Sequence, residues 1–114
     1  MMHIRPAAVA GAFYPGDPVT LAREVEEFVR RAAPPAAGET APKAIIAPHA
    51  GYMYSGPVAG SAYARVSCLR GKVSRVVLAG PAHRVFVRGA AVPEATAFAT
   101  PLGAIELDQE ALAR

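Results

Sequence analysis

The sequence is poor in cysteine and has no long apolar run. Its 114 residues contain one cysteine, Cys68, which excludes an internal disulfide and a CxxC metal knuckle and is typical of a reducing compartment. No stretch reaches the roughly 18 apolar residues that a membrane-spanning helix needs, and residues 1–5 are not followed by an apolar signal core. We therefore expect a cytoplasmic protein with no membrane partner.

Several functional motifs are also absent. The chain has no GxGxxG, GxxxxGK[ST], GxSxG or HExxH string, so the patterns typical of dinucleotide, nucleotide-phosphate, serine-hydrolase and zincin sites are missing. Basic residues exceed acidic ones by 12 to 9, but no basic run is interleaved with aromatic residues, and we expect no nucleic-acid partner. The 53% hydrophobic content is that of a globular domain.

Two apolar segments, residues 43–47 and 74–79, each lead into a turn with a proline and a histidine. They lie in the strings KAIIAPHAGY and SRVVLAGPAHR, and the histidines are His49 and His83. Short continuous apolar runs are typical of strands buried on both faces of a parallel sheet. Because a helix-length segment separates them, the pattern predicts a βαβ unit with both histidines at the carboxyl edge of the sheet, where α/β proteins bind ligands.

Capping signals predict the helices. Asp17-Pro18 should begin a helix that ends before Pro34-Pro35, and Gly56-Pro57 should begin the crossover helix. Residues 85–107 favour a hairpin or meander, and Asp108 should cap a third helix. The expected fold class is α/β, with a mostly parallel sheet flanked by helices.

The sheet predicted for this chain is short of strands, and the helix that Asp108 begins stops after less than two turns. We therefore expect a fragment of a larger α/β domain, a truncated gene product, or a chain that a partner completes. Self-association or a partner that completes the sheet would supply the missing neighbours.

The two histidines indicate a metal site or an acid–base site, because imidazole is a common ligand of zinc, iron and copper and titrates near neutrality. A lone histidine in a turn is usually a hydrogen-bonded surface residue, but equivalent positions after two successive strands favour a functional pair. A third ligand is not evident: Asp17 is used as a cap and Cys68 falls at the opposite edge. The candidate substrate contacts, each of which has a structural role as the competing interpretation, are Tyr52, Tyr54 and Arg84.

Three functions remain open on the residues alone. The pair could serve a non-haem metal enzyme in which His49 and His83 are ligands, or one of them an acid–base catalyst. It could serve a binding module for an anionic or aromatic group, with the histidines and Arg84 as donors. It could also serve a zinc-dependent hydrolase. The ligand would be a small molecule or a peptide.

Four strings in order, RPAAVAGAFYPGDP, KAIIAPHAGYMYSG, VVLAGPAHR and ATPLGAIELD, resemble the opening motifs of the Memo family, also called the AmmeMemoRadiSam system protein B family. That family resembles the class III extradiol dioxygenases, which are non-haem iron enzymes with an α/β fold. The resemblance implies that His49 and His83 bind a metal, iron(II) in the first place and copper or zinc as alternatives. It also implies that the intact protein is a metal-dependent oxidoreductase.

The resemblance covers only the amino-terminal part of the family's chains. It implies a third metal ligand, a cysteine, in the carboxyl-terminal part of those chains, and Cys68 does not correspond to it. We therefore expect this chain to contain two of the ligands of a metal site, and we expect no enzymatic activity from the 114 residues alone.

Overall fold

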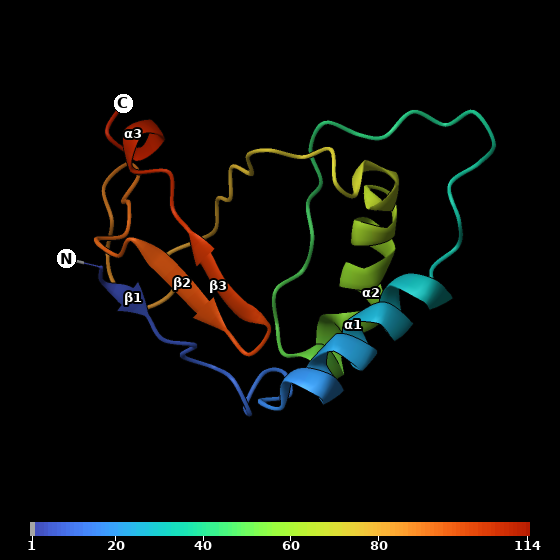
Figure 1. The fold of residues 1–114 in the computed structure, drawn as a ribbon, viewed down its shortest axis with the longest axis horizontal. Helices are drawn as coiled ribbons and strands as arrows, with labels where there is room; N and C mark the ends of the chain where they lie inside the picture. The colour runs from blue at the N-terminus through green and yellow to red at the C-terminus, as the bar shows by residue number, and fades with distance from the viewer. Residues whose placement is uncertain (1) are drawn as a thin grey trace.

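The computed structural model describes residues 2–114 as a pair of helices beside a small sheet (Figure 1). In chain order the elements are β1 (Ile4–Arg5), α1 (Pro18–Arg31), α2 (Tyr52–Ala64), the 3-10 helix η1 (Ser67–Leu69), β2 (Ala97–Thr100), β3 (Gly103–Glu106) and α3 (Gln109–Leu112). This mixture confirms the α/β class. Within these residues, no helix has the length and apolar character needed to cross a bilayer.

Helix α1 begins and ends as its sequence predicts. The Asp17 carboxylate accepts hydrogen bonds from the backbone N–H of Thr20 at 2.8 Å and from its hydroxyl at 2.7 Å. These bonds favour the charged carboxylate and hold the pKa of Asp17 below its ordinary value. Leu21 is buried at 3% exposure and fixes the inner face of the helix.

Helix α2 begins earlier than predicted, at Tyr52 rather than at Gly56-Pro57. Its N-cap is Gly51, whose carbonyl accepts from the backbone N–H of Ser55 at 3.0 Å. Pro57 therefore lies inside the helix, where its missing N–H leaves one helical hydrogen bond unmade. The prediction was wrong by about one turn because contacts from outside the helix, described below, hold its first residues in place.

Two glycines let α1 and α2 pack closely. A Cβ atom at Gly56 would lie 2.6 Å from the ring of Phe28, and one at Gly60 would lie 2.6 Å from the Phe28 carbonyl oxygen. Neither position accommodates a side chain without a shift. The small residues that the sequence places on this helix thus bring it against another helix and not against a sheet.

The sheet is small and mixed, with strand order β1-β2-β3. Strand β1 pairs in parallel with β2 through Ile4↔Ala97 and Arg5↔Phe98. Strands β2 and β3 form an antiparallel hairpin, from Ala97↔Glu106 to Thr100↔Gly103. The hairpin confirms the prediction for this region, and parallel pairing is confined to the short β1.

The two segments expected to be parallel strands are not strands in this structure. Residues 43–47 and 74–79 belong to no sheet, and among residues 2–114 no backbone hydrogen bond joins them to another backbone group. Ile46 is 99% exposed and Val77 is 91% exposed. A strand needs a neighbour for its N–H and C=O groups, so an apolar run without one stays unpaired. Nor do the helices flank the sheet, because they lie beside it (Figure 1).

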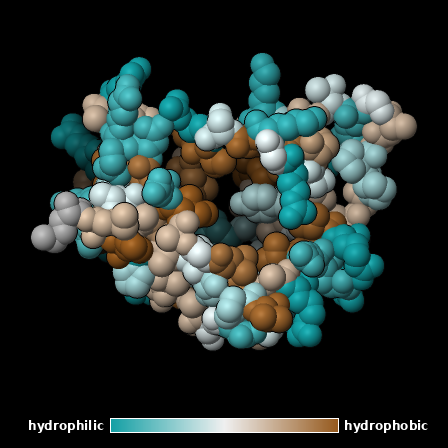
Figure 2. All heavy atoms as spheres, viewed as in Figure 1, coloured by the Kyte–Doolittle hydropathy of each residue, from teal (hydrophilic) through white to brown (hydrophobic). Residues whose placement is uncertain are grey.

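The molecule exposes much more surface than its mass requires. Its accessible area is 9583 Å², against about 5,900 Å² for a compact protein of this size. Its radius of gyration is 15.5 Å, against about 13 Å for a compact chain. Figure 2 shows hydrophobic side chains gathered around a hollow on one face. The buried apolar core is correspondingly small, consisting of Leu21, Ala64, Ala95 and Ala97.

Candidate metal centre

His49 and His83 meet through their Nε2 atoms, which lie 3.0 Å apart. Their ring centroids are 5.2 Å apart and the rings are tilted by 43°. At this distance one imidazole donates its Nε2–H to the lone pair of the other. The structure therefore brings together two exposed residues that are 34 positions apart in sequence. They converge although the segments before them do not pair as strands.

Hydrogen bonds on both sides hold the turn that carries His49. The buried Ser55 donates from Oγ to the carbonyl of Ala50 at 2.9 Å. The backbone N–H of Tyr52 donates to the carbonyl of Phe13 at 2.7 Å. The turn is thus fixed between the first turn of α2 and the segment that precedes α1. The sequence interpretation missed both Ser55 and Phe13, and a serine in the first turn of a helix was the available signal.

The segment before α1 forms a compact turn. Gly11 has a φ of +80°, a left-handed conformation that favours glycine, and its N–H donates to the carbonyl of Tyr14 at 2.8 Å. The N–H of Phe13 donates to the carbonyl of Val9 at 2.9 Å. This turn presents Phe13 and Tyr14 toward α2. The segment before α1 is thus a folded support for the turn that carries His49.

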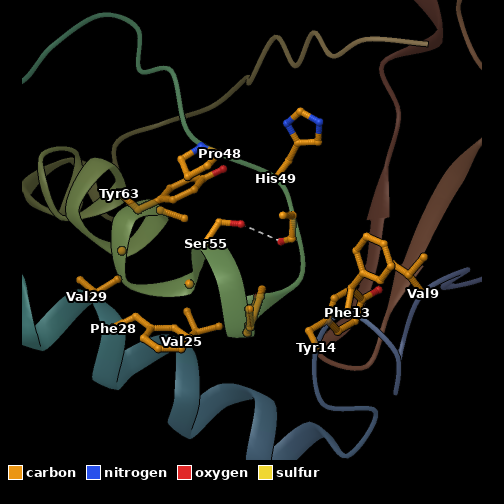
Figure 3. Close-up of a pocket in the computed structure, with 15 residues that line it drawn as sticks. Val9, Phe13, Tyr14, Val25, Phe28, Val29, Pro48, His49, Ser55 and Tyr63 are labelled. Carbon is orange, nitrogen blue, oxygen red and sulfur yellow. Dashed lines mark hydrogen bonds between the residues drawn. The ribbon is translucent and has the colours of Figure 1, made fainter. Parts of the chain in front are cut away.

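A cavity of about 440 Å³ lies between this turn, α1, α2 and the residues around His49. Figure 3 shows the His49 ring pointing away from the apolar wall formed by Val25, Phe28 and Val29. The lining is mostly apolar, with the hydroxyls of Ser55 and three tyrosines as polar groups; the tyrosines are Tyr14, Tyr52 and Tyr63. The cavity therefore offers an apolar compartment with His49 in its wall.

Tyr52 is packed among aromatic rings in this wall. Its ring lies 5.8 Å from that of Tyr14 and 5.7 Å from that of Phe28, in an edge-on arrangement with the latter. Burial raises the pKa of the Tyr52 phenol above its ordinary value, and Tyr14 and the Glu24 carboxylate raise it further. Tyr52 is thus a neutral hydroxyl at neutral pH.

The other sequence-predicted residues lie in different places. Tyr54 is 80% exposed and does not line the cavity. Arg84 directly follows His83 and its side chain is exposed. Cys68 is exposed in η1, beyond the far end of α2, and His3 is bonded through its backbone to Thr96 beside the sheet. Of the three candidate substrate contacts, the structure places Tyr52 in the cavity wall, and Arg84 is the chain neighbour of His83.

The spacing of the two imidazoles suits a shared metal ion. Two nitrogens bonded to one metal at about 2.1 Å lie about 3.0 Å apart for an angle of about 90° and about 3.4 Å apart for about 109°. The observed separation is 3.0 Å. Among residues 2–114, no group of three or more His, Cys, Asp or Glu side chains is arranged to hold a metal. The described residues thus supply two imidazole nitrogens at this spacing, with no third side chain of these types grouped with them.

The fold and the site define an α/β protein with a paired-histidine centre beside an apolar cavity. The profile of the family described as Memo-like protein matches residues 5–114, and the chain belongs to this family. The family resemblance seen in the sequence is thereby confirmed.

Curated relatives agree with this assignment. The chain is 36% identical over 107 residues to a MEMO1 family protein of Schizosaccharomyces pombe, covering 94% of this chain and 33% of the relative. It is 44% identical over 112 residues to a MEMO1 family protein of Methanothermobacter thermautotrophicus, covering 94% of this chain and 40% of the relative. A MEMO1 family protein of Aeropyrum pernix is 40% identical over 118 residues, with coverages of 96% and 41%. The chain thus spans 33% to 41% of the length of these relatives.

Proposed function

We propose that His49 and His83 are two ligands of a non-haem metal, with iron(II) as the first candidate and copper or zinc as alternatives. The intact protein would be a metal-dependent oxidoreductase with a fold related to the extradiol dioxygenases. One observation carries the proposal: the two Nε2 atoms lie 3.0 Å apart, the spacing of adjacent ligands on one metal. The match of the chain to the Memo-like family supports it.

The protein's own residues would prepare this site in three ways. Ser55 and the Phe13 carbonyl fix the turn that carries His49, which keeps the imidazole in position. The apolar cavity would exclude water and hold the apolar part of a substrate. Tyr52 would remain a neutral hydrogen-bonding group there. A bound metal would supply Lewis-acid and redox chemistry next to this compartment.

Metal binding by the chain tests the proposal. In an anaerobic titration with Fe(II), and in parallel ones with Cu(II) and Zn(II), His49→Ala and His83→Ala should each lower the affinity at least about tenfold. His3→Ala is the matched control, because His3 lies beside the sheet and should leave the affinity unchanged. Equal metal affinity in the wild type, His49→Ala and His83→Ala would overturn the proposal. Tight zinc binding without iron or copper binding would favour the hydrolase instead.

A second copy of the chain, or a polypeptide partner, would cover the exposed apolar segments around the site. The exposed residues include Ile46 before His49 and the pair Val77 and Leu78 before His83, at 99%, 91% and 82% exposure. Such a partner would give the unpaired backbone of these segments the neighbours that a strand needs. This assembly is part of the proposal.

A further inference from the structure

Acidic and basic residues are segregated along the chain. Residues 40–93 contain seven lysines and arginines and no aspartate or glutamate. The rest of the chain contains five basic and nine acidic residues. Both His49 and His83 lie inside the acid-free segment. The turns that carry the two histidines therefore belong to a segment whose only charged side chains are basic.

Most of this charge is not neutralised within the described part of the chain, residues 2–114. Arg65 is paired with Glu39 at 3.1 Å and Arg75 with Asp108 at 2.7 Å. The other five cations of the segment form no ion pair there; they are Lys43, Arg70, Lys72, Arg84 and Arg88. A surplus of unpaired positive charge attracts anions and raises their local concentration.

Arg84 is the cation closest in sequence to the histidine pair. It directly follows His83, so the two Cα atoms are about 3.8 Å apart, and its exposed side chain has no hydrogen-bond partner among residues 2–114. A guanidinium presents a planar fork of donors that matches a carboxylate or a phosphate. Nothing in the described chain engages this fork.

Apolar surface is available on both segments that carry the histidines. The cavity of about 440 Å³ has His49 in its wall, and Val85 and Phe86, which follow Arg84, are 72% and 91% exposed. A ligand that satisfies both features has an apolar body and one anionic group. An inorganic anion would leave the apolar surface uncovered, and a neutral apolar molecule would leave Arg84 unpaired.

We propose that the histidine site takes an organic anion, an apolar group that carries a carboxylate or a phosphate, and that Arg84 determines this specificity. The inference rests on the proposed function in that it names the substrate class of the same site. The anionic group lies against Arg84 and the histidines, and the apolar body enters the cavity. The acid-free segment steers the anion to the site.

Binding of simple probes to the chain tests the inference. Hexanoate and hexyl phosphate supply the two anionic groups, hexanol is the neutral analogue, and inorganic phosphate lacks the apolar body. Calorimetry or NMR titration in the presence of a chelator measures their affinities without metal. We expect one or both hexyl anions to bind at least about tenfold more tightly than hexanol and than inorganic phosphate. The better of the two anions identifies the group that is recognised.

Variants assign the effect to Arg84. Arg84→Ala should weaken binding of the better anion about tenfold or more, because it removes charge and fork together. Arg84→Lys should recover part of the affinity, since it keeps the charge and loses the fork. Arg70→Ala is the matched control: it removes the same charge from the same segment, just after η1 at the far end of α2, and should change affinity less than about twofold.

Three results would overturn the inference: hexanol binding as tightly as the anions, equal losses in Arg84→Ala and Arg70→Ala, or tighter binding of a short oligonucleotide than of either hexyl anion. The outcome is distinguishable from that of the metal titration. If His49→Ala loses metal binding and Arg84→Ala does not change the anion affinity, the metal proposal holds and the anion site is excluded. If anion binding depends on Arg84 in a chain that binds no metal, the anion site holds and the metal proposal fails.

Discussion

At the scale of single residues, the histidine pair depends on a few hydrogen bonds around one turn. Ser55 is 6% exposed and its hydroxyl donates to Ala50, the residue after His49. Phe13 accepts from the backbone of Tyr52 on the other side of the turn. These contacts hold His49 where its Nε2 reaches that of His83. The position of His49 therefore depends on hydrogen bonds that join its turn to Ser55 of α2 and to Phe13 before α1.

Ser55→Ala should lower both stability and metal affinity. The change removes a buried hydroxyl and frees the Ala50 carbonyl, so we expect the free energy of unfolding in urea to fall by about 1 kcal/mol. The affinity for metal should fall several-fold, because the turn that carries His49 is less restrained. Ser61→Ala is the control: Ser61 makes a similar bond to the Pro57 carbonyl on the exposed side of α2 and should change neither quantity appreciably. Unchanged metal affinity in Ser55→Ala would show that the bond does not position the site.

At the scale of elements, the packing of α1 against α2 depends on two glycines with different neighbours. The position of a Cβ at Gly60 is blocked by the Phe28 backbone, whose carbonyl oxygen would be 2.6 Å away. At Gly56 the obstacle is the Phe28 ring, which packs edge-on against Tyr52. One contact thus involves atoms that cannot move independently of α1, and the other involves a side chain. The two positions should respond differently to the same substitution.

Gly60→Ala should destabilise the chain although alanine is the better helix former. The gain in helix propensity is about 1 kcal/mol, but the clash with the Phe28 backbone forces the helices apart, and we expect a net loss of about 1–3 kcal/mol in urea denaturation. Gly56→Ala should cost less.

Phe28→Leu separates the two cases. It should relieve the cost of Gly56→Ala, because the obstructing ring is gone, and leave the cost of Gly60→Ala unchanged, because the carbonyl remains. A stabilised Gly60→Ala variant would contradict the packing described here.

At the scale of the whole molecule, the main feature is a large solvent-exposed apolar surface. The accessible area of 9583 Å² exceeds the expectation for a compact chain by more than half. Much of the exposed apolar surface lies in the segments that precede the two histidines and in Val85 and Phe86 behind the second. Exposed surface of this kind marks interaction sites or aggregation. The chain spans 33% to 41% of the length of the three curated relatives.

We expect the chain to self-associate through these segments. Val77→Asp, at a position that is 91% exposed, should shift sedimentation profiles toward the monomer over the micromolar range, because it places a charge in the apolar interface. Val19→Asp is the matched control, since Val19 is 75% exposed at the start of α1, where an acidic residue is well tolerated. A wild-type chain that remains monomeric at high concentration, or equal effects of the two variants, would argue against this interface.

The sequence predicted most of what depends on neighbouring residues. Asp17-Pro18 and Asp108 mark the starts of α1 and α3, and both aspartates cap their helices as expected. The hairpin of β2 and β3 falls in the region where glycine and proline interrupt short apolar runs. The sequence also indicated that His49 and His83 belong together, although the reason differs, because they meet without a sheet.

The sequence by itself thus determined the helix caps, the presence of the helices and the pairing of His49 with His83. Each of these depends on residues within a few positions or on a repeated local pattern. Only the tertiary structure decided where α2 begins, which groups hold His49, and whether the apolar segments pair. The start of α2 depends on a hydrogen bond to Phe13, far away in the chain. A strand forms only where another backbone supplies hydrogen-bond partners. An apolar run indicates that a segment can be buried as a strand, but the run does not supply the neighbouring backbone.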